Sequence, residues 1–181
     1  MSGHSHWATT KRDKAVTDSK RSQIFTKISR LITVAAKKGG GDIDGNPSLR
    51  LAVEKARDAR MPKENIQKAI DKGTGKGGGD ILEEITYEGY GPEGVAFMVK
   101  TVTDNKNRTV GEVRNIFNRF GGSLGGAGST SYIFGNDPEN PSFFIDVNDK
   151  DVLGKLMALM DALDDIDDVQ DVYSNFRTNE A

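Results

Sequence analysis

The stretch KGTGKGGGDILEEITYEGYGPEGVAFMVKTV, from Lys72 to Val102, is where the chain changes from helical to strand-like sequence. Its glycine-rich beginning, Lys72 to Asp80, predicts a flexible linker. ILEEITYEGY reads as a strand, and Val95–Val102 reads as a second one that is apolar on both faces, as a central strand is. We therefore expect two domains: a helical one over residues 1–78 and an α+β one over residues 79–181.

Upstream of the linker, apolar residues recur at helical spacing and predict a three-helix domain. The first helix follows Ser22, and its apolar face consists of Ile24, Ile28, Leu31, Ile32 and Ala35. The second follows Pro47, with the inner stripe Leu49, Ala52, Val53 and Ala56. Pro62 ends the second helix, because proline lacks the amide that continues a helix, and it suits the first turn of the third. The third helix has Ile66, Ala69 and Ile70 inside and stops at Gly73.

Downstream of the linker, strand and helix signals alternate. Thr109–Glu112 has the pattern of a capping box and predicts the start of a helix. STSYIF and SFFIDV predict two short strands, a helix capped by Asn148 or Asp149 follows, and DVQDVYSNF predicts the last strand. The order β-β-α-β-β-α-β predicts the α+β class: a ferredoxin-like type of domain with a mostly antiparallel sheet and helices on one face.

The composition excludes several classes of protein. The 181 residues include no cysteine, so disulfides, thiolate zinc sites and cysteine nucleophiles are excluded. No stretch approaches the ~20 apolar residues of a membrane helix, and the polar N-terminus lacks the apolar core of a signal peptide. We therefore expect a cytoplasmic protein without a membrane partner.

The formal net charge of -2 hides a strong asymmetry between the two halves. Residues 1–79 carry 17 Lys and Arg against 8 Asp and Glu, whereas residues 80–181 carry 8 against 19. A basic half joined to an acidic half indicates a nucleic-acid partner for the basic part. Mutual attraction of the two halves is the alternative, and both can hold.

The basic stretch at the N-terminus is the strongest functional signal. Lysine and arginine neutralise phosphates, and an aromatic ring stacks on a base or sugar. The predicted nucleic-acid contacts are His4, Trp7, Lys11, Arg12, Lys14, Lys20, Arg21, Lys27 and Arg30. For Trp7, a hydrophobic staple that pins the N-terminal arm to the helices is an equal alternative.

The other motifs predict no metal, cofactor or catalytic site. His4 and His6 have the spacing of a metal pair, but the chain holds only these two histidines and no cysteine. No nucleophile, base and orienting group occur together, so we expect a protein that is not an enzyme. The glycine-rich loop Gly121–Gly128 stays ambiguous, because its amides suit a phosphate while a loop in a small domain needs glycine anyway.

Aspartates crowd the end of the last predicted helix, where they oppose the helix dipole. They are Asp161, Asp164, Asp165, Asp167 and Asp168. A solvated acidic surface is the simplest interpretation, and a protein partner at this helix end is the functional alternative.

Four blocks of the sequence together resemble the YebC/PmpR family. They are GHSHWATTKRDKAVTDSKRSQIFTKISRLITVAAKKGGGD, NPSLRLAVEKARDARMPKENIQKAIDKGTG, YEGYGPEGVAFMVKTVTDNKNRTVGEVRNIF and DALDDIDDVQDVYSNF. The resemblance implies a bacterial transcriptional regulatory protein that binds DNA through a basic helical domain. It also implies an alternative, a ribosome- or RNA-associated translation factor, because a mitochondrial relative activates translation of a cytochrome oxidase subunit.

The chain departs from the family pattern at two places. His6 stands where the family opening G-H-S-K-W has lysine, which removes one fixed positive charge. The family's third domain is expected between the strand matching STSYIF and the terminal strand-helix-strand, but FGNDPENPSFF spans this gap in a few residues. We therefore expect the third domain to be missing near residues 135–142.

Overall fold

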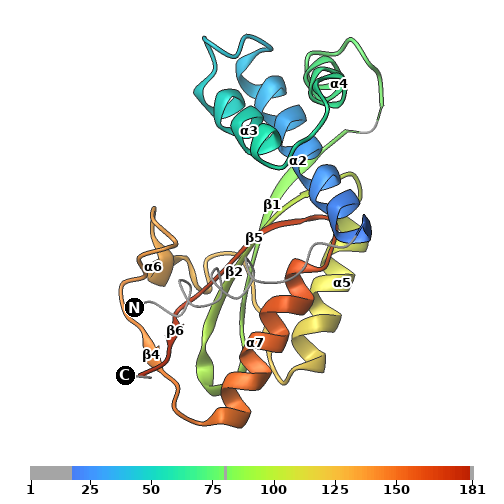
Figure 1. The fold of residues 1–181 in the computed structure, drawn as a ribbon. Helices are drawn as coiled ribbons and strands as arrows, with labels where there is room; N and C mark the ends of the chain where they lie inside the picture. The colour runs from blue at the N-terminus through green and yellow to red at the C-terminus, as the bar shows by residue number, and fades with distance from the viewer. Residues whose placement is uncertain (1–17, 80, 180–181) are drawn as a thin grey trace. The chain divides into compact units, whose positions relative to one another are not determined.

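The computed structural model describes residues 18–79 and 81–179. These residues form two compact units, one within Val16–Glu83 and the other within Glu84–Ala181. The first unit is helical and the second combines helices with a sheet (Figure 1).

Three helices make up the described part of the first unit: α2 (Asp18–Gly39), α3 (Pro47–Asp58) and α4 (Lys63–Gly73). Helices α3 and α4 both pack on α2. Ile32, Leu49 and Val53 are among the fully buried residues of the core between them. The inner stripes predicted for α3 and α4 are buried as expected, but Ile24 of α2 is 37% exposed and Phe25 packs against the core instead.

A buried asparagine closes the connection between α2 and α3. The side-chain oxygen of Asn46 accepts a hydrogen bond from the amide of Leu49 at 3.1 Å and so caps α3. Its Nδ2 donates to the carbonyl oxygens of Ala35, at 2.9 Å, and Gly40, at 2.8 Å. One side chain thus begins α3 and satisfies carbonyls at the end of α2, which fixes the turn between the helices.

Gly73 allows α4 to approach α2 closely. A Cβ atom at this position would lie 2.4 Å from the carbonyl oxygen of Thr33. The hydroxyl of Thr33 donates to the carbonyl oxygen of Ala69 at 3.1 Å, which ties the same two helices together. Gly73 was predicted only as a helix stop, and its larger role is to make room for this contact.

The second unit is built on a four-stranded sheet with the order β3-β1-β2-β5 among the described residues. Its strands are β1 (Glu83–Tyr90), β2 (Ala96–Thr103), β3 (Ser123–Leu124) and β5 (Val169–Ser174). A short 3-10 helix η1 (Pro92–Gly94) joins β1 to β2. Two further strands, β4 (Ile145–Asp146) and β6 (Phe176–Arg177), pair in parallel.

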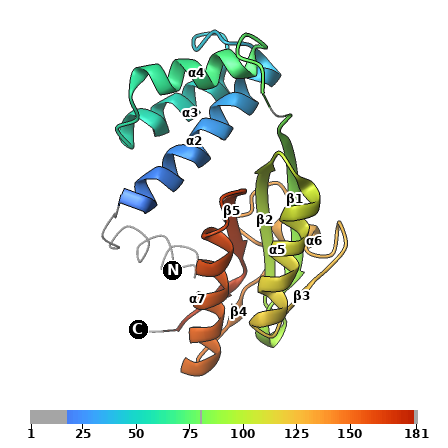
Figure 2. The same cartoon turned by 90° about the vertical axis from the view of Figure 1, so that its right-hand side faces the viewer.

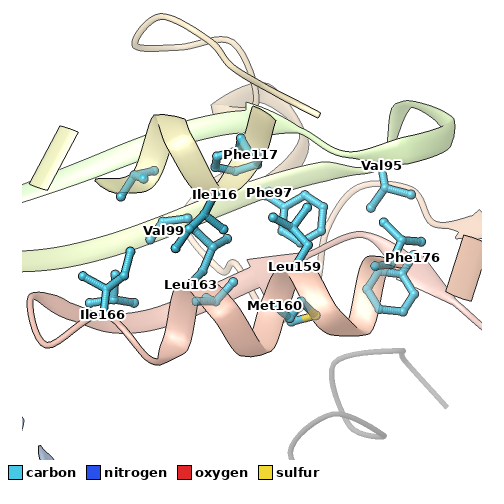
Figure 3. Close-up of a cluster of buried hydrophobic side chains, with 14 of the residues drawn as sticks. Val95, Phe97, Val99, Ile116, Phe117, Leu159, Met160, Leu163, Ile166 and Phe176 are labelled. Atoms are coloured by element: carbon cyan, nitrogen blue, oxygen red, sulfur yellow. The ribbon is translucent and has the colours of Figure 1, made fainter. Parts of the chain in front are cut away.

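Helices α5 (Lys106–Arg119) and α7 (Lys150–Asp164) cover one face of the sheet (Figure 2). The core lies between this face and the two helices, where Val95, Phe97 and Val99 meet residues of both helices (Figure 3). The rings of Phe97 and Phe117 meet edge to face with their centroids 5.8 Å apart. On the opposite face, Ala96 and Met98 pack against the short helix α6 (Ser131–Phe134). Strand β2 is therefore buried on both faces, as its sequence predicted.

The predicted fold class is confirmed: a helical region is followed by an α+β unit with a mostly antiparallel sheet. The split unit β2-α5-β3, with β1 lying between its two strands, is a feature of ferredoxin-like domains. The chain enters through the hairpin β1-β2, however, whereas the ferredoxin-like motif begins β-α-β.

The predicted start of helix α5 is wrong. The helix begins at Lys106, and its N-cap is Asn105, whose side chain accepts from the amide of Arg108 at 3.1 Å. Thr109 therefore lies inside the first turns and is buried, so it does not cap the helix. Asn105 satisfies the amide of Arg108, one of the first-turn amides that lack a partner within the helix.

The strand predicted over Ser129–Phe134 is also wrong, because residues 131–134 form α6. In a strand, Ile133 and Phe134 would point to opposite faces, whereas one helical turn buries both against the sheet. Tyr132 is left 68% exposed. The strand predicted over Ser142–Val147 is shortened to Ile145–Asp146.

Candidate nucleic-acid interface

Helix α2 carries the predicted contacts that the structure describes. Lys20, Lys27 and Arg30 are separated by seven and three residues, which places them on one side of the helix. Arg21 lies four residues before Phe25, whose side chain packs against the core, so it is on the apolar side of the helix. The structure thus groups three of the predicted contacts and separates Arg21 from them.

The predicted contacts at the N-terminus lie outside the described residues. They are His4, Trp7, Lys11, Arg12 and Lys14.

The helical unit also has a pocket that the sequence did not predict. Lys37 of α2 and Lys72 of α4 line it, together with Thr33, Val34 and the segment that follows α4, and its volume is about 240 Å³. That segment contains the glycines predicted as a linker. Lys76 is held to α4, because its amide donates to the carbonyl oxygen of Asp71 at 2.8 Å.

The glycine-rich loop before α6 binds an anion that belongs to the protein itself. Glu88 of β1 is only 6% exposed. Its carboxylate accepts hydrogen bonds from the amide of Gly128 at 2.5 Å and from the amide and hydroxyl of Thr130, both at 3.0 Å. Burial raises the pKa of Glu88, but the hydrogen bonds from Gly128 and Thr130 outweigh it, so the pKa lies below its ordinary value. The loop amide of Gly128, which the sequence analysis considered as a phosphate ligand, therefore donates to Glu88 instead.

A second buried carboxylate joins α5 to the end of α7. Asp168 is 1% exposed and accepts from Nη2 of Arg108 at 2.9 Å and from the hydroxyl of Thr109 at 2.7 Å. Hydrogen bonds to Asp104 and Asp168 raise the pKa of Arg108 further above its ordinary value. Asp168 is therefore structural and does not belong to the acidic surface that the sequence grouped with it. A protein partner at the remaining aspartates of this helix end stays a prediction.

Helix α5 carries cations that the sequence reasoning missed. Lys106–Arg119 contains four of the eight Lys and Arg of residues 80–181, but only one of their 19 acidic residues. The excess of cations in this segment is visible in the sequence, but it was overlooked because the charge was summed over all of residues 80–181.

Within residues 18–79 and 81–179, no group of three or more His, Asp or Glu side chains is placed to hold a metal ion. No helix in the same ranges has the length and apolar character needed to cross a membrane.

Two family models match the chain. One, described as the TACO1/YebC protein N-terminal domain, matches residues 5–76. The other, described as the TACO1/YebC second and third domain, matches residues 82–137. The second match ends at residue 137, within residues 135–142, where we expect the family's third domain to be missing. The absence of that domain stays a prediction.

Curated relatives carry the name "Probable transcriptional regulatory protein". The one from Prosthecochloris aestuarii is 61% identical over 134 residues, which cover 74% of this chain and 54% of the relative. The one from Syntrophus aciditrophicus is 54% identical over 157 residues, covering 86% of this chain and 62% of the relative. The chain thus spans little more than half the length of these relatives.

The fold also matches a solved structure. The crystal structure of a conserved hypothetical protein, Aq1575 from Aquifex aeolicus, superposes with a TM-score of 0.87 at 34% sequence identity. The match covers 97% of this chain and 98% of that chain.

Proposed function

Because the chain belongs to the TACO1/YebC family, we propose that it is a bacterial cytoplasmic regulatory protein that binds DNA through its basic N-terminal helical unit. The observation that carries the proposal is the alignment of Lys20, Lys27 and Arg30 on one side of α2, within a half that has 17 cations against 8 acidic residues. The names of the relatives support a regulatory role, and we assign the chain no catalytic activity.

The chemistry of this face is that of phosphate binding. Ammonium and guanidinium groups neutralise phosphates and release counterions, so affinity depends steeply on salt. Such contacts position a protein on nucleic acid without reading its sequence. The predicted contacts Lys11, Arg12 and Lys14 would add further cations for phosphates.

A salt titration tests the proposal. Binding to a fluorescent DNA duplex of about 25 base pairs is followed by anisotropy from about 50 to about 300 mM NaCl. If about five phosphates are contacted, the slope of log affinity against log salt is about -4.5. A flat dependence, or no binding at low salt, contradicts the proposal.

A charge-matched pair of variants locates the interface. In one, Lys20→Gln, Lys27→Gln and Arg30→Gln are combined, and the slope becomes shallower by about 2 to 3 because each neutralised phosphate accounts for ~0.9 of it. The control combines Lys55→Gln, Lys63→Gln and Lys68→Gln, which removes the same charge from exposed positions of α3 and α4. Equal changes of slope in the two variants would mean that net charge, and not the α2 face, determines binding.

RNA is the alternative ligand for the same face, because phosphate contacts by lysine and arginine do not distinguish the two nucleic acids. The titration is therefore repeated with an RNA duplex of the same length, and sedimentation with ribosomes is measured in cell lysate. RNA binding that is tighter than DNA binding at every salt concentration, together with ribosome association, would replace the DNA proposal by a translation factor.

A further inference from the structure

The exposed cations of α5 are unusual for the unit in which they lie. Of the four cations in this helix, Arg108 is held by Asp104 and Asp168. Within the described part of the chain, the other three make no ion pair or side-chain hydrogen bond, and all are exposed: Lys106, Arg114 and Arg119. Arg119 lies in the last turn of α5, where a positive charge stabilises the helix, whereas the described contacts of this unit give no such role to Lys106 and Arg114.

The outer side of α5 combines one of these cations, Arg114, with amides. Asn107, Arg114 and Asn118 are separated by seven and four residues, so they line up along one side of the helix, and all three are exposed. Asn115 lies next to this row. Gly111 lies in the row between Asn107 and Arg114, and a Cβ atom there would have no neighbour within 4 Å.

This row faces away from the acidic helix α7. Thr109 turns toward Asp168, which follows α7, and is bonded to it at 2.7 Å. Residues two positions apart on an α-helix point about 200° apart, so Asn107 lies on nearly the opposite side from Thr109. The aspartates at the end of α7 are therefore not between the row and an approaching polyanion.

The side chains of the row suit the edges of DNA bases. Asparagine pairs with adenine through two hydrogen bonds in the major groove, and arginine pairs in the same way with guanine. A helix of about 10 Å diameter fits a major groove about 12 Å wide. The phosphate contacts proposed for α2 would provide affinity but carry no information about base sequence.

We propose that α5 is a base-reading helix that enters the DNA major groove, with Asn107, Arg114 and Asn118 facing the bases. The inference rests on the proposed function, and it adds a second surface, on the acidic unit, to the phosphate-binding face of α2. Asn107 and Asn118 are eleven residues apart, about 16 Å along the helix, which corresponds to about five base pairs. The deep, narrow major groove of duplex RNA does not admit a helix, so the surface is specific for DNA.

Selection from a random DNA duplex pool with the full chain tests this inference. We expect a preferred sequence of about four to five base pairs that contains adenine and guanine. The double variant Asn107→Ala and Asn118→Ala keeps every charge, so its salt slope stays unchanged. Its preference for the selected duplex over a scrambled one falls by roughly tenfold to hundredfold for each base that is no longer read. Circular dichroism verifies folding, which alanine in exposed helix positions favours.

An arginine substitution separates base reading from charge. Arg114→Gln weakens the preference for the selected duplex, whereas the control Lys155→Gln removes the same charge from α7 and leaves the preference intact. If the wild type binds DNA in a salt-dependent way but selects no sequence, the inference is overturned while the proposed function stands. The same holds if the double variant Asn107→Ala and Asn118→Ala keeps its full preference for the selected duplex. Tighter binding to an RNA pool also overturns it. Absence of any DNA binding overturns both.

Discussion

At the scale of single residues, the side chains that organise this protein are buried polar groups with several partners each. Glu88 holds the loop before α6 through the amides of Gly128 and Thr130. Asn46 holds the turn between α2 and α3, and Asp168 holds α5. A buried polar group left without its partners costs about 1–3 kcal/mol, so each of these residues is a sensitive position.

Replacing Glu88 by glutamine destabilises the α+β unit by about 1–3 kcal/mol. The amide keeps one accepting oxygen, but its NH2 group faces donors that the carboxylate accepted from. Urea unfolding at pH 7 measures the decrease in the free energy of unfolding. All four tyrosines lie between residues 87 and 173, so tyrosine fluorescence reports on this unit.

The difference between wild type and the Glu88→Gln variant also depends on pH. The pKa of Glu88 in the folded protein is lower than its ordinary value of 4.5. A lowered pKa gives stability that is fully present above the unfolded value and is lost as the pH falls through the folded value. The difference in the free energy of unfolding between wild type and the Glu88→Gln variant therefore becomes smaller below about pH 4.5. If this difference is constant from about pH 6 to about pH 3, the negative charge of Glu88 does not contribute to its interaction with the loop.

Asn46 separates two functions of one side chain. Asn46→Ser keeps a side-chain oxygen that can cap α3 and loses the two bonds donated by Nδ2, whereas Asn46→Ala loses all three. We expect the alanine variant to be less stable than the serine variant by about 1–2 kcal/mol, the usual contribution of an N-cap. Chemical unfolding followed by circular dichroism measures both. Equal stability of the two variants would mean that the cap contributes nothing.

At the scale of helices and strands, glycines show how the same residue type has opposite roles in different places. Gly73 of α4 lies against the backbone of Thr33 in α2, where a Cβ atom would come within 2.4 Å. Gly154 of α7 is exposed, and a Cβ atom there has no neighbour within 4 Å. The first glycine is required by packing, and the second only lowers the stability of its helix.

The same substitution at these two positions therefore changes stability in opposite directions. Gly73→Ala is destabilising by about 1–3 kcal/mol, because α4 must move away from α2. Gly154→Ala is stabilising by about 1 kcal/mol, because alanine favours the helix interior. Thermal unfolding of both variants checks this pair. A stable Gly73→Ala variant would show that the helices adjust without cost.

At the scale of the whole molecule, each unit has a hydrophobic core of its own. Ile32 and Leu49 belong to one core, and Phe97 and Leu163 belong to the other. The charges are divided in the same way, with most cations in the helical half and most acidic residues in the other.

Two separate cores predict two unfolding transitions. Asn46→Ala shifts the transition seen only by circular dichroism, while Glu88→Gln shifts the one that tyrosine fluorescence follows. The reason is that each variant weakens contacts within a single unit. If both substitutions shift the same single transition, this expectation is contradicted, and the two units unfold together.

Much of the fold was predictable because it depends on the spacing of apolar residues. The inner stripes of α3 and α4 and the doubly buried strand β2 follow from the 3.6-residue and two-residue periods. The start of α5 and the helix α6 were mispredicted because their determinants are distant: Thr109 is bonded to Asp168, and Ile133 packs against β2. Of the candidate site, the cations of α2 were predictable from charge, whereas the separation of Arg21 from the others follows from the packing of α2.

The sequence by itself determined the helical and α+β halves, the division of charge between them and the family, because periodicity, net charge and motifs are local properties of the chain. Only the tertiary structure decided that the glycine loop binds Glu88, that Asp168 is buried and that Arg108 is paired while Arg114 is exposed. These outcomes depend on which groups from distant segments meet away from water, where an unpaired charge or amide is costly and each partner must be supplied by the fold.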